Sequence, residues 1–170
     1  MKDLNGYDHM MAGYYKKMSN YSLPLLSWEF YGESHAALEI FKDDINNLNK
    51  LSKNWDFNKD YYTKLIEEQS VIIVTSPNLE IVYASKNIEK LNGYSPNEVI
   101  GNSPKMFQGE GTCEKTSAKV RDAINNGVPF EVSILNYRKD TTTYMCTIKG
   151  YPVHDKKGKL VNYIAFEKAA

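Results

Sequence analysis

Residues 71–101, VIIVTSPNLEIVYASKNIEKLNGYSPNEVIG, decide the fold of this chain, because strand signals and helix signals follow one another within them. Two short runs rich in β-branched residues enclose the turn formers at 76–78, which predicts a β-hairpin. Two short helices are expected next. Gly93 would end the first of them, and residues 95–98 (SPNE) form a capping box with proline at the first helical position of the second.

The C-terminal half continues with one helix and three strands. Residues 112–127 predict an amphipathic helix with Val120 and Ile124 facing inward and Gly127 as its stop. The strand-like stretches that follow are 129–140, 142–155 and 159–168, the last two joined by the turn KKGK. This order of elements predicts an α+β fold, a five-stranded antiparallel sheet with short helices on one face.

One polar residue stands out on an inward strand face. Phe130, Val132, Ile134 and Asn136 alternate with more polar neighbours, so the four share one face of their strand. A buried amide must find a hydrogen-bond partner. For Asn136 that partner would be a ligand, Cys146 or the backbone, or a trapped water.

The N-terminal residues, to about Gln69, follow a helical period instead. A stripe of apolar side chains with Ser34 as its N-cap predicts one helix: Leu38, Phe41, Ile45 and Leu48. The stripe either packs on the chain's own sheet or forms a dimer seam. We predict an N-terminal helical extension over residues 1–69, acting as a cap or a dimerisation region, and a second domain over 70–170.

Two details of this extension are further expectations. A second helix would begin near Asp56 or Asn58 as N-cap, with Tyr61 and Leu65 turned inward. The apolar residues that precede the first helix are expected to be buried: Leu25, Leu26, Trp28 and Phe30.

Charge and composition exclude several function classes. Lys plus Arg and Asp plus Glu number 21 each, so nothing favours nucleic acid or an anionic membrane as a partner. No apolar run approaches the roughly 20 residues that span a bilayer, and the N-terminus lacks the apolar core of a secretory signal. We therefore expect a cytoplasmic protein.

Enzyme chemistry finds no support in the sequence. Cys113 and Cys146 lack the spacing of metal ligands. No nucleophile–base set, no carboxylate pair and no phosphate-binding loop is recognisable. The chain is predicted not to be an enzyme.

Several strings taken together resemble PAS domains of the LOV flavin-photoreceptor branch. They are 76–101, FQGEGT (107–112), VRDAINNG (120–127), LNYRKD (135–140) and GKLVNYIAFE (158–167). The resemblance covers residues of about 70 to 168. It implies a PAS fold that cups a ligand between the inner face of the sheet and the helices.

The resemblance also implies candidate ligand-binding residues. Gln108 matches a glutamine that contacts the flavin ring, and Asn136 matches an asparagine that holds the ring's polar edge. Lys105 stands where an arginine binds the flavin phosphate, and Arg121 matches a second phosphate arginine.

Four positions depart from the LOV pattern. Ser103 and Cys146 replace asparagines, Glu167 replaces a glutamine, and Pro104 stands at the place of the photoactive cysteine. Proline has no thiol, so conventional LOV photochemistry is not expected.

These departures also weaken the case for flavin itself. Each lost ligand hydrogen bond costs about 1 to 3 kcal/mol. A buried Glu167 would need a partner, for which Lys105 and Lys149 are the candidates.

The sequence thus favours a stand-alone PAS sensory or regulatory module that binds a small molecule or a partner protein and signals through its N-terminal helices. We expect a homodimer with an unidentified signalling partner. The cofactor is unknown, with FMN as the alternative in a cysteine-less blue-light or redox sensor. A third reading is an interaction domain whose cavity is filled by its own side chains.

Overall fold

The computed structural model describes residues 26–57 and 60–170, with side chains from residue 39 onward. Of the described residues, 26–36 belong to one compact unit and those from 37 to 170 to a second, and every described strand lies in the second. Among the described residues, no helix has both the length and the apolar content of a membrane span.

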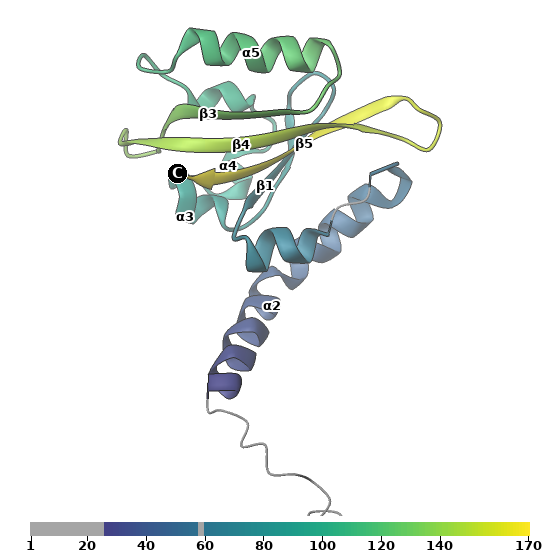
Figure 1. Cartoon of the computed structure of the whole chain (residues 1–170), viewed down its shortest axis with the longest axis vertical. Coiled ribbons are helices and arrows are strands. Elements are labelled where there is room, and N and C mark those ends of the chain that lie inside the picture. Colours follow the sequence, from purple (N-terminus) through teal and green to yellow (C-terminus); the bar gives the residue numbers. More distant parts are fainter. Residues whose placement is uncertain (1–25, 58–59) are drawn as a thin grey trace, which may run out of the picture. The chain divides into compact units, whose positions relative to one another are not determined.

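The second unit is built on a five-stranded antiparallel sheet of order β2-β1-β5-β4-β3 (Figure 1). The strands are β1 Val71–Thr75, β2 Ile81–Ala84, β3 Phe130–Tyr137, β4 Thr143–His154 and β5 Leu160–Ala169. This confirms the predicted fold class. The central strand β5 comes last in the chain, so the N-terminal hairpin and the C-terminal strands close into one sheet.

The short helices lie between β2 and β3 in the chain and cover the inner face of the sheet. They are α3 Ile88–Asn92, α4 Pro96–Val99, the 3-10 turn η3 Pro104–Phe107 and α5 Glu114–Asn125. Gly93 follows α3 with φ of 80°, a left-handed conformation that favours glycine. The capping box of Ser95 and Glu98 begins α4 as predicted.

The outer face is covered by the chain's own N-terminal helical segments. These are the part of α2 (Leu26–Leu51) from residue 39 onward, η1 Ser52–Asn54 and η2 Thr63–Glu67. Leu48 is fully buried there, and Phe41 and Ile45 pack against the same cluster as Phe166 of β5. Three residues of the predicted stripe therefore pack on the chain's own sheet, while the side chain of Leu38 lies outside the described residues.

Buried polar contacts also fix the end of α2 on the sheet. The carboxylate of Asp44 is 3% exposed. It accepts a hydrogen bond of 2.7 Å from the hydroxyl of Tyr83 on β2 and one of 3.1 Å from the backbone N–H of Lys86. Burial, followed by the bond to Asp44, raises the pKa of Tyr83. The phenol therefore stays a donor.

Some predicted helix boundaries were wrong. Helix α2 begins at Leu26, so Ser34 lies inside it rather than at its N-cap. Asp56 does not cap the next helix. Asp60 does, because its Oδ1 accepts from the backbone N–H groups of Tyr62 and Thr63 at 3.0 and 3.3 Å. Asn58 lies outside the described residues, as do Leu25 and the side chains of Leu26, Trp28 and Phe30.

Candidate functional site

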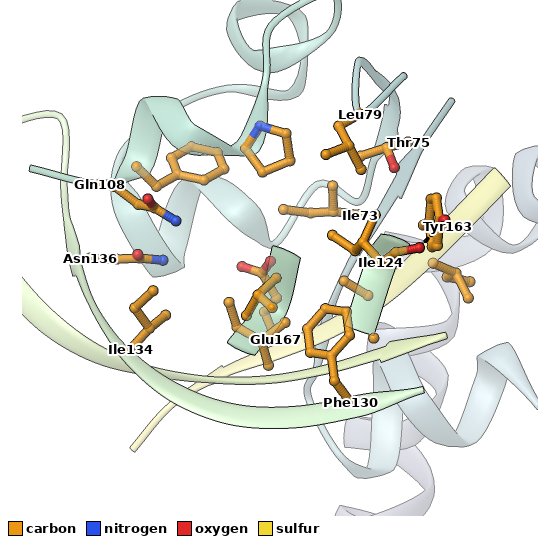
Figure 2. Close-up of a pocket in the computed structure, with 17 residues that line it drawn as sticks. Ile73, Thr75, Leu79, Gln108, Ile124, Phe130, Ile134, Asn136, Tyr163 and Glu167 are labelled. Carbon is orange, nitrogen blue, oxygen red and sulfur yellow. Dashed lines mark hydrogen bonds between the residues drawn. The ribbon is translucent and has the colours of Figure 1, made fainter. Parts of the chain in front are cut away.

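A cavity of about 100 Å³ lies between the inner face of the sheet and the helices (Figure 2). Apolar residues line most of it: Ile73, Leu79, Pro104, Phe107, Val120, Ile124, Phe130, Ile134, Ile148 and Ile164. Both residues predicted to face inward from α5, Val120 and Ile124, are among them. An apolar hollow with few polar groups is typical of a small-molecule site.

Three polar side chains meet at one end of this cavity. Figure 2 shows the amides of Gln108 and Asn136 and the carboxyl of Glu167 turned into it. Gln108 follows η3, Asn136 lies on β3 and Glu167 lies on β5. Asn136 is 3% exposed and Glu167 is 4% exposed. No hydrogen bond joins the three to one another among the described side chains. Glu167 accepts a weak bond from Cys146, and Asn136 lies within hydrogen-bonding reach of the Tyr144 hydroxyl.

The strands explain why these groups meet. Asn136 continues the inward alternation of β3 that begins at Phe130, as the sequence predicted. Glu167 pairs with Val71 on one side and Ile148 on the other, because β5 is the central strand. Its carboxyl is therefore held away from any sheet edge and from water.

Glu167 is the most perturbed acid of the site. Burial raises its pKa to about 7, and the hydrogen bond from Cys146 opposes this rise. The Cys146 thiol donates to Oε2 of Glu167 across 3.7 Å. Burial is also the main cause that raises the pKa of Cys146. The thiol thus stays protonated, and Cys146 acts as a weak donor behind Glu167.

The seven residues named by the sequence divide into two groups. Gln108, Asn136 and Glu167 line the cavity, and Cys146 touches it only through Glu167. Ser103, Lys105 and Arg121 are exposed and do not contribute to the wall. Ser103 instead caps η3, where its Oγ accepts from the backbone N–H of Lys105 at 3.4 Å.

Neither lysine proposed as a partner for Glu167 serves as one. Lys149 pairs with Glu131 at 3.1 Å on the exposed side of the sheet, and Lys105 is exposed. The two residues Glu131 and Lys149 are direct cross-strand neighbours in the β3–β4 register.

Three residues of the connector 101–109 (GNSPKMFQG) line the cavity, and one of them is Gln108. Pro104 and Phe107 both line it, and Phe107 is 1% exposed and also packs in the main inner cluster. Met106 packs against the same cluster. Phe107 therefore belongs both to the packed core and to the cavity wall.

The sequence did not single out the opposite end of the cavity. Thr75 and Tyr163 lie there (Figure 2). The hydroxyl of Thr75 is buried and has no hydrogen-bond partner among the described residues. Tyr163 donates to the backbone carbonyl of Ile124 at 2.9 Å. In the sequence Thr75 is an ordinary strand residue. Only the folded sheet shows that it lines the cavity.

The cavity does not fit a whole FMN as it stands. Sites for ligands of that class enclose about 300 to 1,000 Å³, whereas this cavity has about 100 Å³. The two cations implied as phosphate ligands are outside its wall, and proline occupies the place of the thiol. The polar side chains of Gln108, Asn136 and Glu167 would suit the edge of a ring smaller than flavin.

Comparison with known proteins agrees with this architecture. A family model described as "PAS domain" matches residues 68–168. Phototropin-2 of Oryza sativa subsp. japonica is 35% identical over 109 residues, which are 64% of this chain and 12% of that protein. The blue-light photoreceptor of Listeria innocua is 32% identical over 105 residues, which are 59% of this chain and 42% of that protein. The chain thus spans less than half the length of these relatives.

Solved structures show the same likeness. The structure named "Flavin Analogue Sheds Light on Light-Oxygen-Voltage Domain Mechanism" has a TM-score of 0.61 and 30% identity, covering 66% of this chain and 86% of the other. The dark structure of the Aureochrome1 LOV photoreceptor has a TM-score of 0.60 and 32% identity, covering 68% and 86%. The chain belongs to the PAS domain family, and its PAS domain is LOV-like.

Proposed function

We propose that this chain is a sensory module that binds a small molecule in its inner cavity and signals through its N-terminal helical segments. The observation that carries the proposal is the polar end of the cavity. Gln108, Asn136 and Glu167 turn toward an apolar hollow without bonding one another. At the other end, the buried hydroxyl of Thr75 has no hydrogen-bond partner among the described residues. A buried polar group without a partner costs about 1 to 3 kcal/mol, which favours a ligand that supplies the missing bond.

Strand β5 supports a route from the cavity to the outer face. Glu167 lines the cavity, whereas its neighbour Phe166 packs in the outer cluster with Leu48 of α2. The next residue, Lys168, bonds Glu68 just after η2 at 3.4 Å. A ligand that moves Glu167 would therefore shift the surface on which α2 and η2 rest. The ligand would move the equilibrium between the two arrangements of α2 and η2 on the sheet only as far as its affinities for these arrangements differ.

The test compares the chain purified under native conditions with the same chain unfolded, dialysed and refolded. Native mass spectrometry should show a bound small molecule only in the first sample. Hydrogen exchange in α2 should differ between the two samples.

Asn136→Leu should make the native sample resemble the refolded one, while the exposed control Asn97→Leu should not. Identical masses and identical exchange in all samples would refute the proposal.

A flavin sensor without the cysteine is the second candidate. Its support is that the relatives carry names such as phototropin and blue-light photoreceptor. It requires a wider cavity in the flavin-bound chain than in this structure, with Lys105 and Arg121 as the phosphate ligands. Absorption spectroscopy decides this: flavin bands in the purified chain support it, and a colourless chain that takes up no added FMN rejects it.

Homodimer formation and a partner protein for the output remain predictions. The exposed side chain of Ile40 on α2 is available for such a contact, with 57% of its surface accessible. Sedimentation velocity of the chain with and without its ligand would measure homodimer formation.

A further inference from the structure

Glu167 brings a carboxyl into the cavity without a cation to neutralise it. The carboxyl of Glu167 accepts a hydrogen bond from the thiol of Cys146, which is a weak donor with no charge. Among the described residues, no lysine or arginine nitrogen lies within ion-pair distance of this carboxyl. A buried carboxylate is stable only when it is paired, well hydrogen-bonded or protonated.

Three lysines near this region pair with other carboxylates. Lys168 pairs with Glu68 at 3.4 Å, and Lys149 pairs with Glu131 at 3.1 Å. Lys86 pairs with Asp43 at 3.1 Å beside α2. Burial raises the pKa of Glu167 and the hydrogen bond from Cys146 opposes the rise, with no contribution from a lysine. Among the side chains that the structure describes, none therefore supplies the positive charge that would suit this carboxylate.

The neighbours of Glu167 define the chemistry of the missing group. Gln108 and Asn136 each present a carbonyl oxygen as well as an amide N–H₂, so a donor-rich ligand finds up to three acceptors at this end. The remaining wall is apolar and includes the rings of Phe107 and Phe130. The site thus combines a hydrogen-bond-accepting end with a surface suited to a flat hydrocarbon ring.

We propose that the ligand of this cavity is a small planar cation, an amidine or a protonated amino-heterocycle, whose N–H groups pair with Glu167 and whose ring lies against the apolar wall. The proposal rests on the proposed function and specifies its ligand. A planar cation and a carboxylate form parallel charge-assisted hydrogen bonds, which are stronger than neutral ones. The cavity of about 100 Å³ is smaller than an apolar cavity of about 150 Å³ that admits benzene, so its wall must widen to take a substituted ring.

The test uses two ring compounds of nearly the same shape. Benzamidine carries a planar cation, whereas benzamide is neutral. We expect benzamidine to bind the full chain at least about tenfold more tightly at pH 8, from the strength of a hydrogen bond to a charged group. Isothermal titration calorimetry measures both affinities, and chemical shifts of the Asn136 and Gln108 amides locate the binding.

Matched variants assign the effect to the buried carboxyl. Glu167→Gln keeps the shape and removes the charge, and should abolish the preference for benzamidine. Glu131→Gln removes an exposed carboxylate from the same sheet and should leave the preference unchanged.

Equal affinity of the wild-type chain for both probes, tighter binding of benzamide, or no binding of benzamidine would each overturn the inference, even if Glu167→Gln failed to fold. These results leave the wider proposal standing, because co-purification of a ligand and exchange in α2 test that separately.

Discussion

Removing the charge of Glu167 should stabilise the ligand-free chain in a pH-dependent way. The carboxyl is buried, and burial raises its pKa from 4.5 to about 7 in the folded chain. Between these two values the folded chain binds the proton more tightly than the unfolded chain does. Stability from this group is therefore greatest below pH 4.5 and falls as the pH rises to about 7.

The size of the effect follows from the shift. A pKa shift of one unit corresponds to about 1.4 kcal/mol, so the wild-type chain should lose about 3 kcal/mol at this group between pH 4.5 and pH 8. Glu167→Gln, which has no proton to release, should lose none of it. The free energy of unfolding of the variant should therefore rise by about 3 kcal/mol relative to that of wild type between pH 4.5 and pH 8.

Urea denaturation at the two pH values measures this difference. Other titrating groups are common to both chains, so their contributions cancel in the comparison. Glu131→Gln serves as the control, because Glu131 is exposed and should give no such pH-dependent difference. If the stability difference between Glu167→Gln and wild type is the same at pH 4.5 and pH 8, Glu167 is not a buried acid of raised pKa and the reasoning fails.

Three further substitutions test how the sheet is covered. Asp44→Ala should destabilise the chain by about 1.5 to 3 kcal/mol for each hydrogen bond lost to the charged group, and should speed hydrogen exchange in α2; Asp43→Ala, at an exposed position, should do neither. Leu48→Ala should cost about 2 to 5 kcal/mol in denaturant unfolding, whereas Ile40→Ala should cost under about 0.5 kcal/mol; equal costs would place the stripe elsewhere than on the sheet. Gly150→Ala would put a methyl group 2.3 Å from the facing aromatic ring on β3, so it should destabilise by about 1 to 3 kcal/mol, and an unchanged melting temperature would contradict that packing.

The strand pattern predicted more of the site than the loops did. Asn136 could be placed inward because side chains alternate along a strand and its alternate neighbours are apolar. The hairpin and the capping box could also be predicted, because each depends on residues that are close together in the sequence. The resemblance to LOV domains supplied Gln108 and Glu167, which no local pattern marks as special.

The errors fall where distant segments decide the outcome. Ser34 has good N-cap chemistry, but α2 starts eight residues earlier, and helix length depends on context that propensity does not describe. Lys149 was a candidate partner for Glu167, yet the β3–β4 register gives it to Glu131. The contact between Cys146 and Glu167 depends on the register of the central strand β5 against β4. This register could not be predicted from the sequence.

Native mass spectrometry of the chain as purified tests the central claim most directly. We expect a species heavier than the 19.5 kDa chain by one small organic molecule, present in wild type and absent from Asn136→Leu. The bare chain mass in wild type, together with an experimental structure in which the space beside Asn136 is filled by the chain's own side chains, would contradict it.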